Sequence, residues 1–494
     1  MPSWSGFTNG SYQAENFLAD QEDTINFFVE RMESPGALSR QVLRPTPGFK
    51  TFATLPDINT SGAKMAGSRA FVVTGPSLYE LFVDGTYTNR GTVKQNSNPA
   101  TISYNGTAGH QLFITSGGDG YCFDLNTNTL TDVLSGTATM GAFANDYFLA
   151  FNIATGNVQL SALQDGSSWP GQSFSRSLFP DPWQALFVDN QGLLWLPGTE
   201  TFEVWYFNPN NFPQPFAPLT GQVGRYGIGA PFAWAVCGSE VLWLSANAEG
   251  GAIVIAPQQA GGTAVSNYAI AQALSGAQRT AKISDAEAFS YQEGGHTFFV
   301  LALPSVPQTW AYDVDKPMMW GETARLTPAG NWAKRGRWDV NENRYDLWSP
   351  RVHLYAFGKH LVGDRTTGII AEMTSSVAME IDGSGIRRLR QAPVLPTEYQ
   401  RHPIDFFQLV CDTGLGTSAG QGATPEAMLR VSTDGGRTWG NELWAGAGPM
   451  GTYGKRVYWT RLGAGAVPTL QVVMTDPVPW RITDAYLNNV EQVA

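Results

Sequence analysis

Short runs of apolar residues recur along most of the chain, and glycine, proline, asparagine or aspartate bounds each run. Residues 70–73 and 78–82 flank a turn at 75–77, and the pair Asp84-Gly85 follows. Such runs predict β-strands, and an Asp-Gly pair predicts a hairpin turn. A similar pair of apolar runs recurs at 111–114 with 121–124, 193–196 with 202–206, 241–244 with 252–255, 297–301 with 309–313, and 352–357 with 369–370. The pattern therefore predicts a series of repeated hairpins.

The spacing of these hairpins indicates a fold. Asp84 and Asp124 are 40 residues apart, which is typical of a four-stranded blade. We predict an all-β chain in which residues 61–375 form a β-propeller of about six blades, with Trp and Phe filling the space between blades. The alternative is an irregular double-sheet sandwich, but one sandwich rarely needs that much chain. Only 268–274 and 284–288 predict short helices.

The segments on either side of the propeller have a different pattern. Residues 1–60 predict an extended N-terminal arm, because two prolines and a glycine within 45–48 break regular structure. The alternative is a first strand and loop that enter the main domain. Residues 376–494 predict a linker followed by a C-terminal β-sandwich, since strand-like runs there alternate with Gly- and Pro-rich turns. We interpret the basic cluster Arg387, Arg388 and Arg390 as a solvated linker, with a contact to a partner or to DNA phosphate as the alternative.

The length and composition of the chain predict more than one domain and argue against several classes of function. A single core stops growing near ~250–300 residues, so a chain of 494 residues predicts at least two domains. The net charge of −11 argues against a grip on nucleic acid driven by net charge, although DNA could still slide through a pore. The three cysteines are far apart, which predicts neither disulfides nor a zinc site and fits synthesis in a reducing cytoplasm. We expect neither a signal peptide nor membrane insertion, because the start is not basic and no apolar run approaches ~20 residues.

One local motif stands out near the C-terminus. The Asp-box pattern S-x-D-x-G-x-T-W is matched at every fixed position by Ser432, Asp434, Gly436, Thr438 and Trp439. The aspartate can accept backbone N–H groups of the turn, the glycine can take positive φ, and the tryptophan can anchor the turn on a sheet. We interpret the motif as a structural turn. Since sialidases and other glycan-handling propellers carry several such boxes, a glycan-binding or glycan-hydrolysing propeller is the alternative function.

Catalytic and metal-ligating patterns are weak. Residues 416–420 fit G-x-S-x-G, but a flexible loop surrounds them where a nucleophile needs a strand and then a helix. The five histidines stand in neither an HxH nor an HExxH frame, and no acidic pair has a setting suited to glycoside hydrolysis. We therefore predict no catalytic, cofactor-binding or metal-ligating residues, no cofactor, and no enzyme activity.

Four stretches together carry a resemblance to a known family. They are 23–30 leading to 46–48, 193–198 with 203–206, 295–299 leading to 309–313, and 431–436 with 455–463. In this order they resemble the tail-hub, or packaged-DNA stabilisation, proteins of short-tailed bacteriophages (podoviruses), which are similar to the propeller-bearing nozzle proteins of other short-tailed phages. The resemblance implies a structural virion protein without catalytic residues.

The same resemblance implies an assembly and a set of partners. We expect a homo-hexameric ring that forms the tail hub, or nozzle, below the portal-adaptor (head-to-tail) protein. The ring would seal packaged DNA and dock tailspikes or tail fibres and a needle or plug. Double-stranded DNA would pass through the lumen without specific binding. The protein would be made in the host cytoplasm and reside in the virion tail.

Overall fold

The computed structural model describes residues 4, 6–16, 18–34, 36–37, 39–176, 178–211, 213–247, 251–258, 261–314, 332–395 and 398–487. Over these ranges the chain is almost entirely β, with two helices, α1 (Gly106–Gly109) and α2 (Tyr268–Thr280). The helix predicted at 268–274 lies within α2. The helix predicted at 284–288 is wrong, because that segment is a turn followed by the first residues of a strand. None of the described helices has the length and apolarity that a membrane crossing requires.

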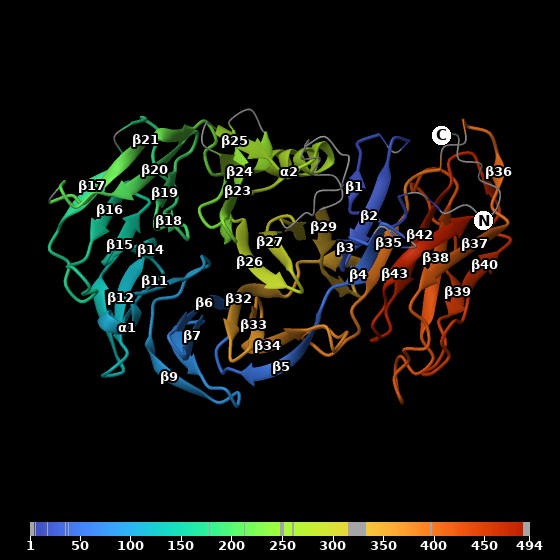
Figure 1. Cartoon of the computed structure of the whole chain (residues 1–494), viewed down its shortest axis with the longest axis horizontal. Helices are drawn as coiled ribbons and strands as arrows, with labels where there is room; N and C mark the ends of the chain where they lie inside the picture. Colours follow the sequence, from blue (N-terminus) through green and yellow to red (C-terminus); the bar gives the residue numbers. More distant parts are fainter. Residues whose placement is uncertain are drawn as a thin grey trace.

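A propeller of seven four-stranded antiparallel blades forms the larger part of the molecule (Figure 1). Blades 1 to 5 each consist of four consecutive strands. Blade 1 is formed by β6 (Thr60–Ala66), β7 (Arg69–Thr74), β8 (Ser77–Leu81) and β9 (Tyr87–Thr92), and blade 2 by β10 (Thr101–Tyr104), β11 (Gln111–Ser116), β12 (Asp119–Asp124) and β13 (Thr129–Leu134). Blade 3 is formed by β14 (Met140–Ala144), β15 (Tyr147–Asn152), β16 (Asn157–Leu160) and β17 (Ser173–Ser175), blade 4 by β18 (Phe187–Val188), β19 (Leu194–Pro197), β20 (Phe202–Phe207) and β21 (Phe216–Gly224), and blade 5 by β22 (Trp234–Cys237), β23 (Glu240–Ala246), β24 (Ala252–Gln258) and β25 (Gly261–Ala264).

The last two blades join the propeller to the rest of the chain. Blade 6 consists of β26 (Glu287–Glu293), β27 (His296–Leu303), β28 (Gln308–Asp313) and β29 (Trp332–Arg335). Blade 7 consists of β32 (Pro350–Ala356), β33 (Lys359–Asp364), β34 (Ile369–Thr374) and, as its outermost strand, β5 (Gly48–Thr54) from the N-terminal part of the chain. Its innermost strand β32 contacts β6 of blade 1. The ring of blades is therefore closed by a strand that precedes blade 1 in the sequence.

The propeller predicted from the sequence is confirmed, but it has seven blades where we predicted about six. The paired apolar runs in the sequence identified every blade except blade 3. Its β14–β15 hairpin turns at Asn145 and Asp146, which take positive φ values of 46° and 69°. A two-residue turn of this kind needs left-handed backbone, which Asn and Asp tolerate better than other side-chain-bearing residues. The hairpin that corresponds to the other copies is β15–β16, which does turn at a glycine, Gly156 (φ +67°), but β16 alternates polar and apolar residues over Asn157–Leu160 and shows no apolar run.

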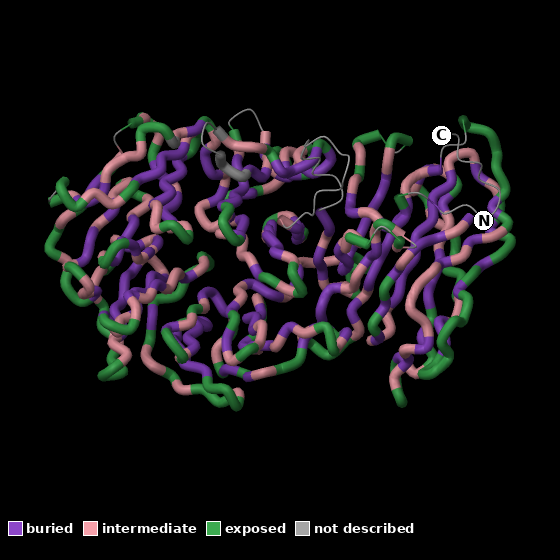
Figure 2. Tube along the Cα trace, in the orientation of Figure 1, coloured by how far each residue is buried: buried purple, intermediate pink, exposed green. Residues whose placement is uncertain are grey.

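Aromatic side chains pack the blades against one another. Blades 3, 4 and 5 share one buried cluster, in which Phe187 of β18 stacks on Trp234 of β22 with ring centroids 4.2 Å apart. Trp183, Trp205 and Trp243 in the same cluster are almost completely buried. Such rings bury large apolar areas and so stabilise the contacts between neighbouring blades. Figure 2 shows the resulting pattern, with buried residues along the strands and exposed residues at the turns.

A β-sandwich packs beside the propeller and is confirmed as the C-terminal domain. One of its sheets has the order β2 (Gln21–Ile25), β35 (Arg388–Gln391), β42 (Thr469–Met474), β38 (Glu426–Ser432) and β39 (Leu443–Gly446), with β1 (Tyr12–Gln13) beside β2. The other has the order β3 (Phe27–Arg31), β4 (Gln41–Pro45), β43 (Ile482–Leu487), β37 (Phe406–Cys411) and β40 (Val457–Thr460). Two small pairs complete the described strands: β30 (Arg337–Asp339) with β31 (Arg344–Asp346), and β36 (His402–Pro403) with β41 (Ala464–Gly465).

The N-terminal segment that we predicted as an extended arm is paired along most of its length. Its strands β1 and β2 belong to one sandwich sheet, β3 and β4 to the other, and β5 to blade 7. Strand β2 also runs parallel to β29 of blade 6, with Ile25 opposite Lys334, and antiparallel to β35. One sheet therefore continues from the propeller into the sandwich. The division of the chain at 60/61 and at 375/376 stays a prediction.

Candidate functional site

The Asp-box turn connects β38 and β39 of the sandwich and uses its side chains as turn ligands. The Asp434 carboxylate accepts hydrogen bonds from the backbone N–H groups of Arg437 (3.0 Å) and Thr438 (2.9 Å) and from the hydroxyls of Thr438 (2.6 Å) and Ser432 (2.7 Å). The Ser432 hydroxyl in turn accepts from the backbone N–H of Gly436 (2.8 Å), which has a φ of +90°. These bonds, led by the Thr438 hydroxyl, lower the pKa of Asp434 to about 2. A carboxylate so occupied by donors is a poor proton acceptor, and the geometry is that of a turn.

The remaining Asp-box residue, Trp439, lies half-buried under the guanidinium of Arg430, whose central carbon is 5.9 Å from the ring centroid. The whole motif is in the sandwich, outside the seven blades. Residues 416–420, which fit G-x-S-x-G, form a surface loop in which Thr417 donates its backbone N–H to Gly422, and neither a strand nor a helix adjoins Ser418. The setting of a nucleophile is therefore missing at this serine.

Two of the three arginines in the basic cluster, Arg388 and Arg390, are buried. At these two positions the prediction of a solvated linker is wrong, and so is the alternative of a contact to DNA phosphate. Arg390 is 0% exposed and donates hydrogen bonds to the carbonyl oxygens of Phe7 (2.6 Å), Gly6 (2.9 Å) and Gly10 (3.1 Å) and to the carboxylate of Glu22. Its guanidinium also lies over the Phe7 ring, 5.8 Å from the centroid. One arginine thus fixes the N-terminal segment to the sandwich.

The two neighbouring arginines have structural contacts as well. Arg388 is 1% exposed and donates to the Val478 carbonyl oxygen. The guanidinium carbon of Arg387 lies 4.2 Å from the Trp338 ring centroid, in the β30–β31 hairpin. The sequence marked these residues as basic, but nothing local to them could show which carbonyl groups they meet, because Arg390's partners are more than 360 positions away.

A buried ion cluster joins the blades where the propeller closes. Glu287 of β26 accepts from Arg351 of β32 (3.0 Å) and from Arg365 (2.8 Å), and Arg351 also donates to Asn59 (2.5 Å) and to the carbonyl oxygen of Ser97 (2.7 Å). The cluster therefore contacts blades 6 and 7 and the segments that lead into blades 1 and 2. Burial alone would raise the pKa of Glu287, but the charges of Arg365 and Arg351 outweigh burial and lower it. No residue-level pattern in the sequence distinguished this carboxylate.

Three of the five histidines lie within hydrogen-bond distance of a carboxylate or of each other. The ring Nδ1 of His296 lies 2.7 Å from the Asp313 carboxylate, and this hydrogen bond raises the pKa of His296. His353 and His360 lie within hydrogen-bond distance of each other, and burial lowers the pKa of His353 to about 4. Within the described ranges, no group of three or more His, Cys, Asp or Glu side chains is placed to hold a metal ion.

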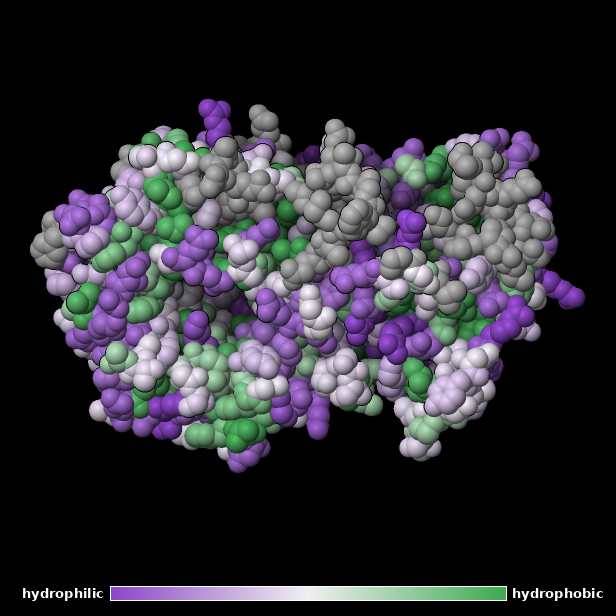
Figure 3. All heavy atoms as spheres, viewed as in Figure 1, coloured by the Kyte–Doolittle hydropathy of each residue, from purple (hydrophilic) through white to green (hydrophobic). Residues whose placement is uncertain are grey.

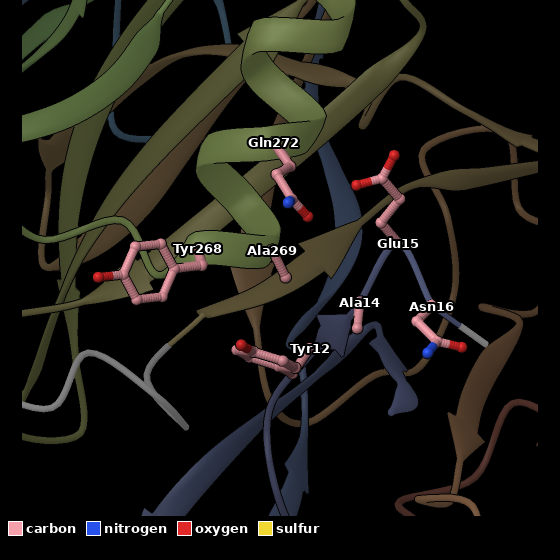
Figure 4. Close-up of a pocket in the computed structure, with 7 residues that line it drawn as sticks. All are labelled: Tyr12, Ala14, Glu15, Asn16, Tyr268, Ala269 and Gln272. Carbon is pink, nitrogen blue, oxygen red and sulfur yellow. The ribbon is translucent and has the colours of Figure 1, made fainter. Parts of the chain in front are cut away.

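A shallow groove of about 400 Å³ lies between the β1–β2 hairpin and the start of helix α2 (Figure 4). Its lining residues are Tyr12, Ala14, Glu15, Asn16, Tyr268, Ala269 and Gln272. The ring of Tyr268 projects away from Glu15 and Asn16 in Figure 4, so the polar groups do not converge on one point. Catalysis requires groups that converge on a reacting atom, and this groove does not provide them.

Comparison with known proteins accounts for both domains. A family model described as bacteriophage P22 Gp10, beta-propeller, matches residues 10–378, and one described as bacteriophage P22 Gp10, beta-sandwich, matches residues 387–488. No curated protein sequence matches the chain.

Solved structures with a similar arrangement are distant in sequence. A catalytically inactive virginiamycin B lyase from Staphylococcus aureus with quinupristin is 8% identical, with a TM-score of 0.40, and covers 65% of this chain and 97% of its own. The N-terminal domain of Nup159 is 10% identical, with a TM-score of 0.39, and covers 71% of this chain and 98% of its own.

The family matches together span most of the chain, in the order propeller and then sandwich, which is the order of the two domains in the structure. The four stretches that carried the resemblance lie in these domains, at β2 to β5, at β19 and β20, at β27 and β28, and at β38 and β40. This chain belongs to the family of bacteriophage P22 Gp10, the tail hub protein of a short-tailed phage.

Proposed function

We propose that this tail hub protein acts as one subunit of a homo-hexameric ring below the portal-adaptor protein. The ring seals packaged DNA, extends the exit channel, and docks tailspikes or fibres and a needle or plug. The observation that carries the proposal is the family match over both domains, residues 10–378 and 387–488.

The construction of the subunit supports this role. A continuous sheet joins blade 6 to the sandwich through β2. Head-to-tail contacts between identical subunits close into a ring when the rotation per subunit fits. Two β-domains joined by this sheet and by the N-terminal segment favour the constant geometry that such closure needs.

The charge of the chain supports a ring through which duplex DNA passes without being bound. Residues 1–387 contain 22 Lys and Arg against 33 Asp and Glu, and the net charge of the chain is −11. Repulsion between like charges extends about 8 Å at physiological salt, so an acidic lumen would let duplex DNA slide. The two buried arginines, Arg388 and Arg390, are not available to bind phosphate.

The accessory parts of the proposal follow from the same family. The protein is a structural component of the virion tail. We further propose that it is made in the host cytoplasm, that it catalyses no reaction and takes no cofactor, and that Ser432, Asp434, Gly436, Thr438 and Trp439 stabilise the β38–β39 turn. The observation in support is the saturation of the Asp434 carboxylate by hydrogen-bond donors of its own turn.

The test compares virus particles with and without this protein. Particles that lack it should package DNA but leak it, because sealing follows filling. The isolated protein should bind duplex DNA no more tightly than the non-specific range of ~10⁻⁴–10⁻⁶ M, with a shallow dependence on salt. Full retention of DNA in its absence would contradict sealing, and tight, steeply salt-dependent binding would show that it grips the genome.

A further inference from the structure

A pair of histidines lies in blade 7, on the side that faces blade 6. The Nε2 atom of His353 in β32 is 3.0 Å from the Nδ1 atom of His360 in β33, and the ring centroids are 5.2 Å apart. A neutral imidazole has one donor and one acceptor nitrogen, so two neutral rings form one hydrogen bond at this distance. The same bond can also form when one ring gains a proton. When both rings are protonated, two N–H groups and two positive charges face each other, and the contact becomes repulsive.

His353 also contacts blade 6, across the seam between the two blades. Its ring centroid is 5.9 Å from that of Tyr291 in β26, whose side chain is almost completely buried. Tyr291 belongs to the apolar cluster that fills this seam, which includes Phe49, Phe298, Trp348, Val362 and Met373. A charged imidazole needs water, and on this side blade 6 covers the ring. A charge on His353 therefore favours separation of the two blades.

Solvent reaches the pair through His360. A shallow pocket of about 270 Å³ is lined by His360 and by the β26–β27 turn, including Glu293 and His296. On the face seen in Figure 3, hydrophilic residues lie at the surface where Figure 1 places β26 and β32. His360 therefore takes up the first proton as pH falls, and His353 takes up the second.

The charged groups of blade 7 and its neighbours are engaged elsewhere. Glu372 of β34 is bound by Lys359 of β33 at 2.7 Å and lies opposite Lys50 of β5. The Tyr355 ring of β32 lies 4.9 Å from that of His360, between centroids. Strand β6, which packs on the other side of β32, carries Lys64. At the start of β32, the side chain of Arg351 binds Glu287 of β26, which also binds Arg365.

The charged groups of blade 6 and of the N-terminal strands are paired in the same way. Asp313 of β28 lies 2.7 Å from the Nδ1 atom of His296 in β27, and Glu30 of β3 binds Arg44 of β4 at 3.1 Å. Arg335 of β29 donates to the carbonyl oxygen of Phe27. Burial raises the pKa of Glu293, so this carboxyl becomes neutral early as pH falls. The other carboxylates named here already have cationic partners, so none is free to compensate a second proton on the histidine pair.

The pKa values of the histidines agree with this geometry. Burial, and then the charge of His360, lowers the pKa of His353 from 6.5 to about 4, and burial lowers that of His360. A chain in which the seam is open binds protons in this range that the closed chain does not, so closure weakens as pH falls from 6.5 to about 4. His296 has the opposite sign, because its hydrogen bond to Asp313 raises its pKa and keeps its contribution at acidic pH. Acid therefore acts on the seam through the His353–His360 pair.

We propose that the His353–His360 pair makes the contact between blades 6 and 7 acid-sensitive: the neutral pair holds the blades together, and the doubly protonated pair separates them. Phe49 of β5 packs in the same seam, so separation also exposes the strand that completes blade 7. The propeller then opens at the blade where its ring is closed. This property belongs to the single subunit and does not depend on assembly into a hexamer.

The test measures hydrogen–deuterium exchange of the full chain at pH 7 and at about pH 4.5, with protection factors corrected for the intrinsic exchange rate at each pH. Protection of β26 and of β32 to β34 should fall by about 10-fold or more, because each pH unit below the ordinary histidine pKa changes the opening equilibrium by up to about tenfold. Protection of β14 to β16 in blade 3, whose strands contain no histidine, should fall less. His353→Gln keeps a hydrogen-bonding side chain that does not titrate and should remove most of the fall. The matched control is His402→Gln, at an exposed histidine of β36, which should behave like the unmodified chain.

Three results would overturn the proposal. The first is a fall in protection of the same size in His353→Gln and in the unmodified chain. The second is an equal fall in blade 3 and in blades 6 and 7, which would show that acid acts on the whole propeller. The third is unchanged protection of the seam in the unmodified chain. Circular dichroism at pH 7 checks folding, and His353→Phe replaces His353→Gln if the latter does not fold, since phenylalanine also fills the space beside Tyr291 and carries no titratable group.

Discussion

Replacing the buried Arg390 by methionine tests how the N-terminal segment is held. The guanidinium donates to three backbone carbonyl oxygens, to the Thr24 hydroxyl (2.9 Å) and to the carboxylate of Glu22, which is itself 4% exposed. Methionine fills similar apolar space but removes all of these donors, and leaves the Glu22 carboxylate with the Asn9 amide and no cation. The substitution therefore breaks a buried ion pair from one side.

The expected magnitude follows from burial. Removing one partner of a buried pair costs about 3–5 kcal/mol, because a charge remains uncompensated. An exposed pair is worth only about 0–1 kcal/mol. The matched control is therefore Arg481→Met, since Arg481 pairs with Asp412 at 2.6 Å but its side chain is 52% exposed. We expect Arg390→Met to lower the free energy of unfolding of the sandwich by about 3–5 kcal/mol, and the control to lower it by less than about 1 kcal/mol.

Two measurements read out the effect. Urea denaturation followed by circular dichroism gives the change in stability, and hydrogen–deuterium exchange of residues 6–12 shows whether the segment has come loose. Adding Glu22→Gln to Arg390→Met should recover part of the loss, because the second change removes the uncompensated charge. If Arg390→Met and Arg481→Met cost the same, and residues 6–12 keep their protection from exchange, then Arg390 does not hold the segment.

Three further predictions concern single carboxylates. Asp434→Ala should destabilise the sandwich by about 1–3 kcal/mol through loss of turn hydrogen bonds, measured by thermal unfolding; an unchanged melting temperature would contradict the turn role. Glu287→Gln should lower the melting temperature of the propeller more at pH 7 than at pH 3, because a lowered carboxyl pKa stabilises the fold only above the range in which the group is protonated. Burial raises the pKa of Glu380 from 4.5 to about 8, so the folded protein holds a proton that the unfolded chain releases, and stability should fall as pH rises from 4.5 to 8. Glu380→Gln should reduce that fall in urea titrations at successive pH values, the remainder coming from groups such as Asp20, whose pKa burial raises to about 7, and an unchanged slope would refute the assignment.

Local patterns predicted the parts of the fold that local interactions determine. The hairpins of blades 1, 2 and 4 to 7 were visible because an apolar run, a turn residue and a second run stand within a short stretch. The Asp box was visible for the same reason, since all the hydrogen bonds of Asp434 fall within residues 432–438. The corresponding hairpin of blade 3, β15–β16, was missed although it turns at Gly156, because β16 alternates polar and apolar residues and shows no apolar run.

Long-range pairing left no comparable signal. Nothing around Ile25 indicates that it lies opposite both Lys334 and Leu389. The buried arginines were misjudged because charged residues are usually solvated, and the carbonyl groups that satisfy Arg390 come from the other end of the chain. The sequence therefore predicted the domains and the Asp-box turn, but neither the closing ion cluster at Glu287 nor the contacts of the N-terminal segment.

The path of the N-terminal segment makes the two domains depend on each other. The segment supplies β1 to β4 to the sandwich and β5 to blade 7, and neither partner exists until residues beyond 350 have been made. Contacts over such sequence distances form slowly, because the entropy of closing the loop is lost before any contact forms. Blade 7 is complete only when β5 pairs with β34, and the same segment pairs with β35 of the sandwich. A subunit with a closed propeller but no sandwich is therefore disfavoured.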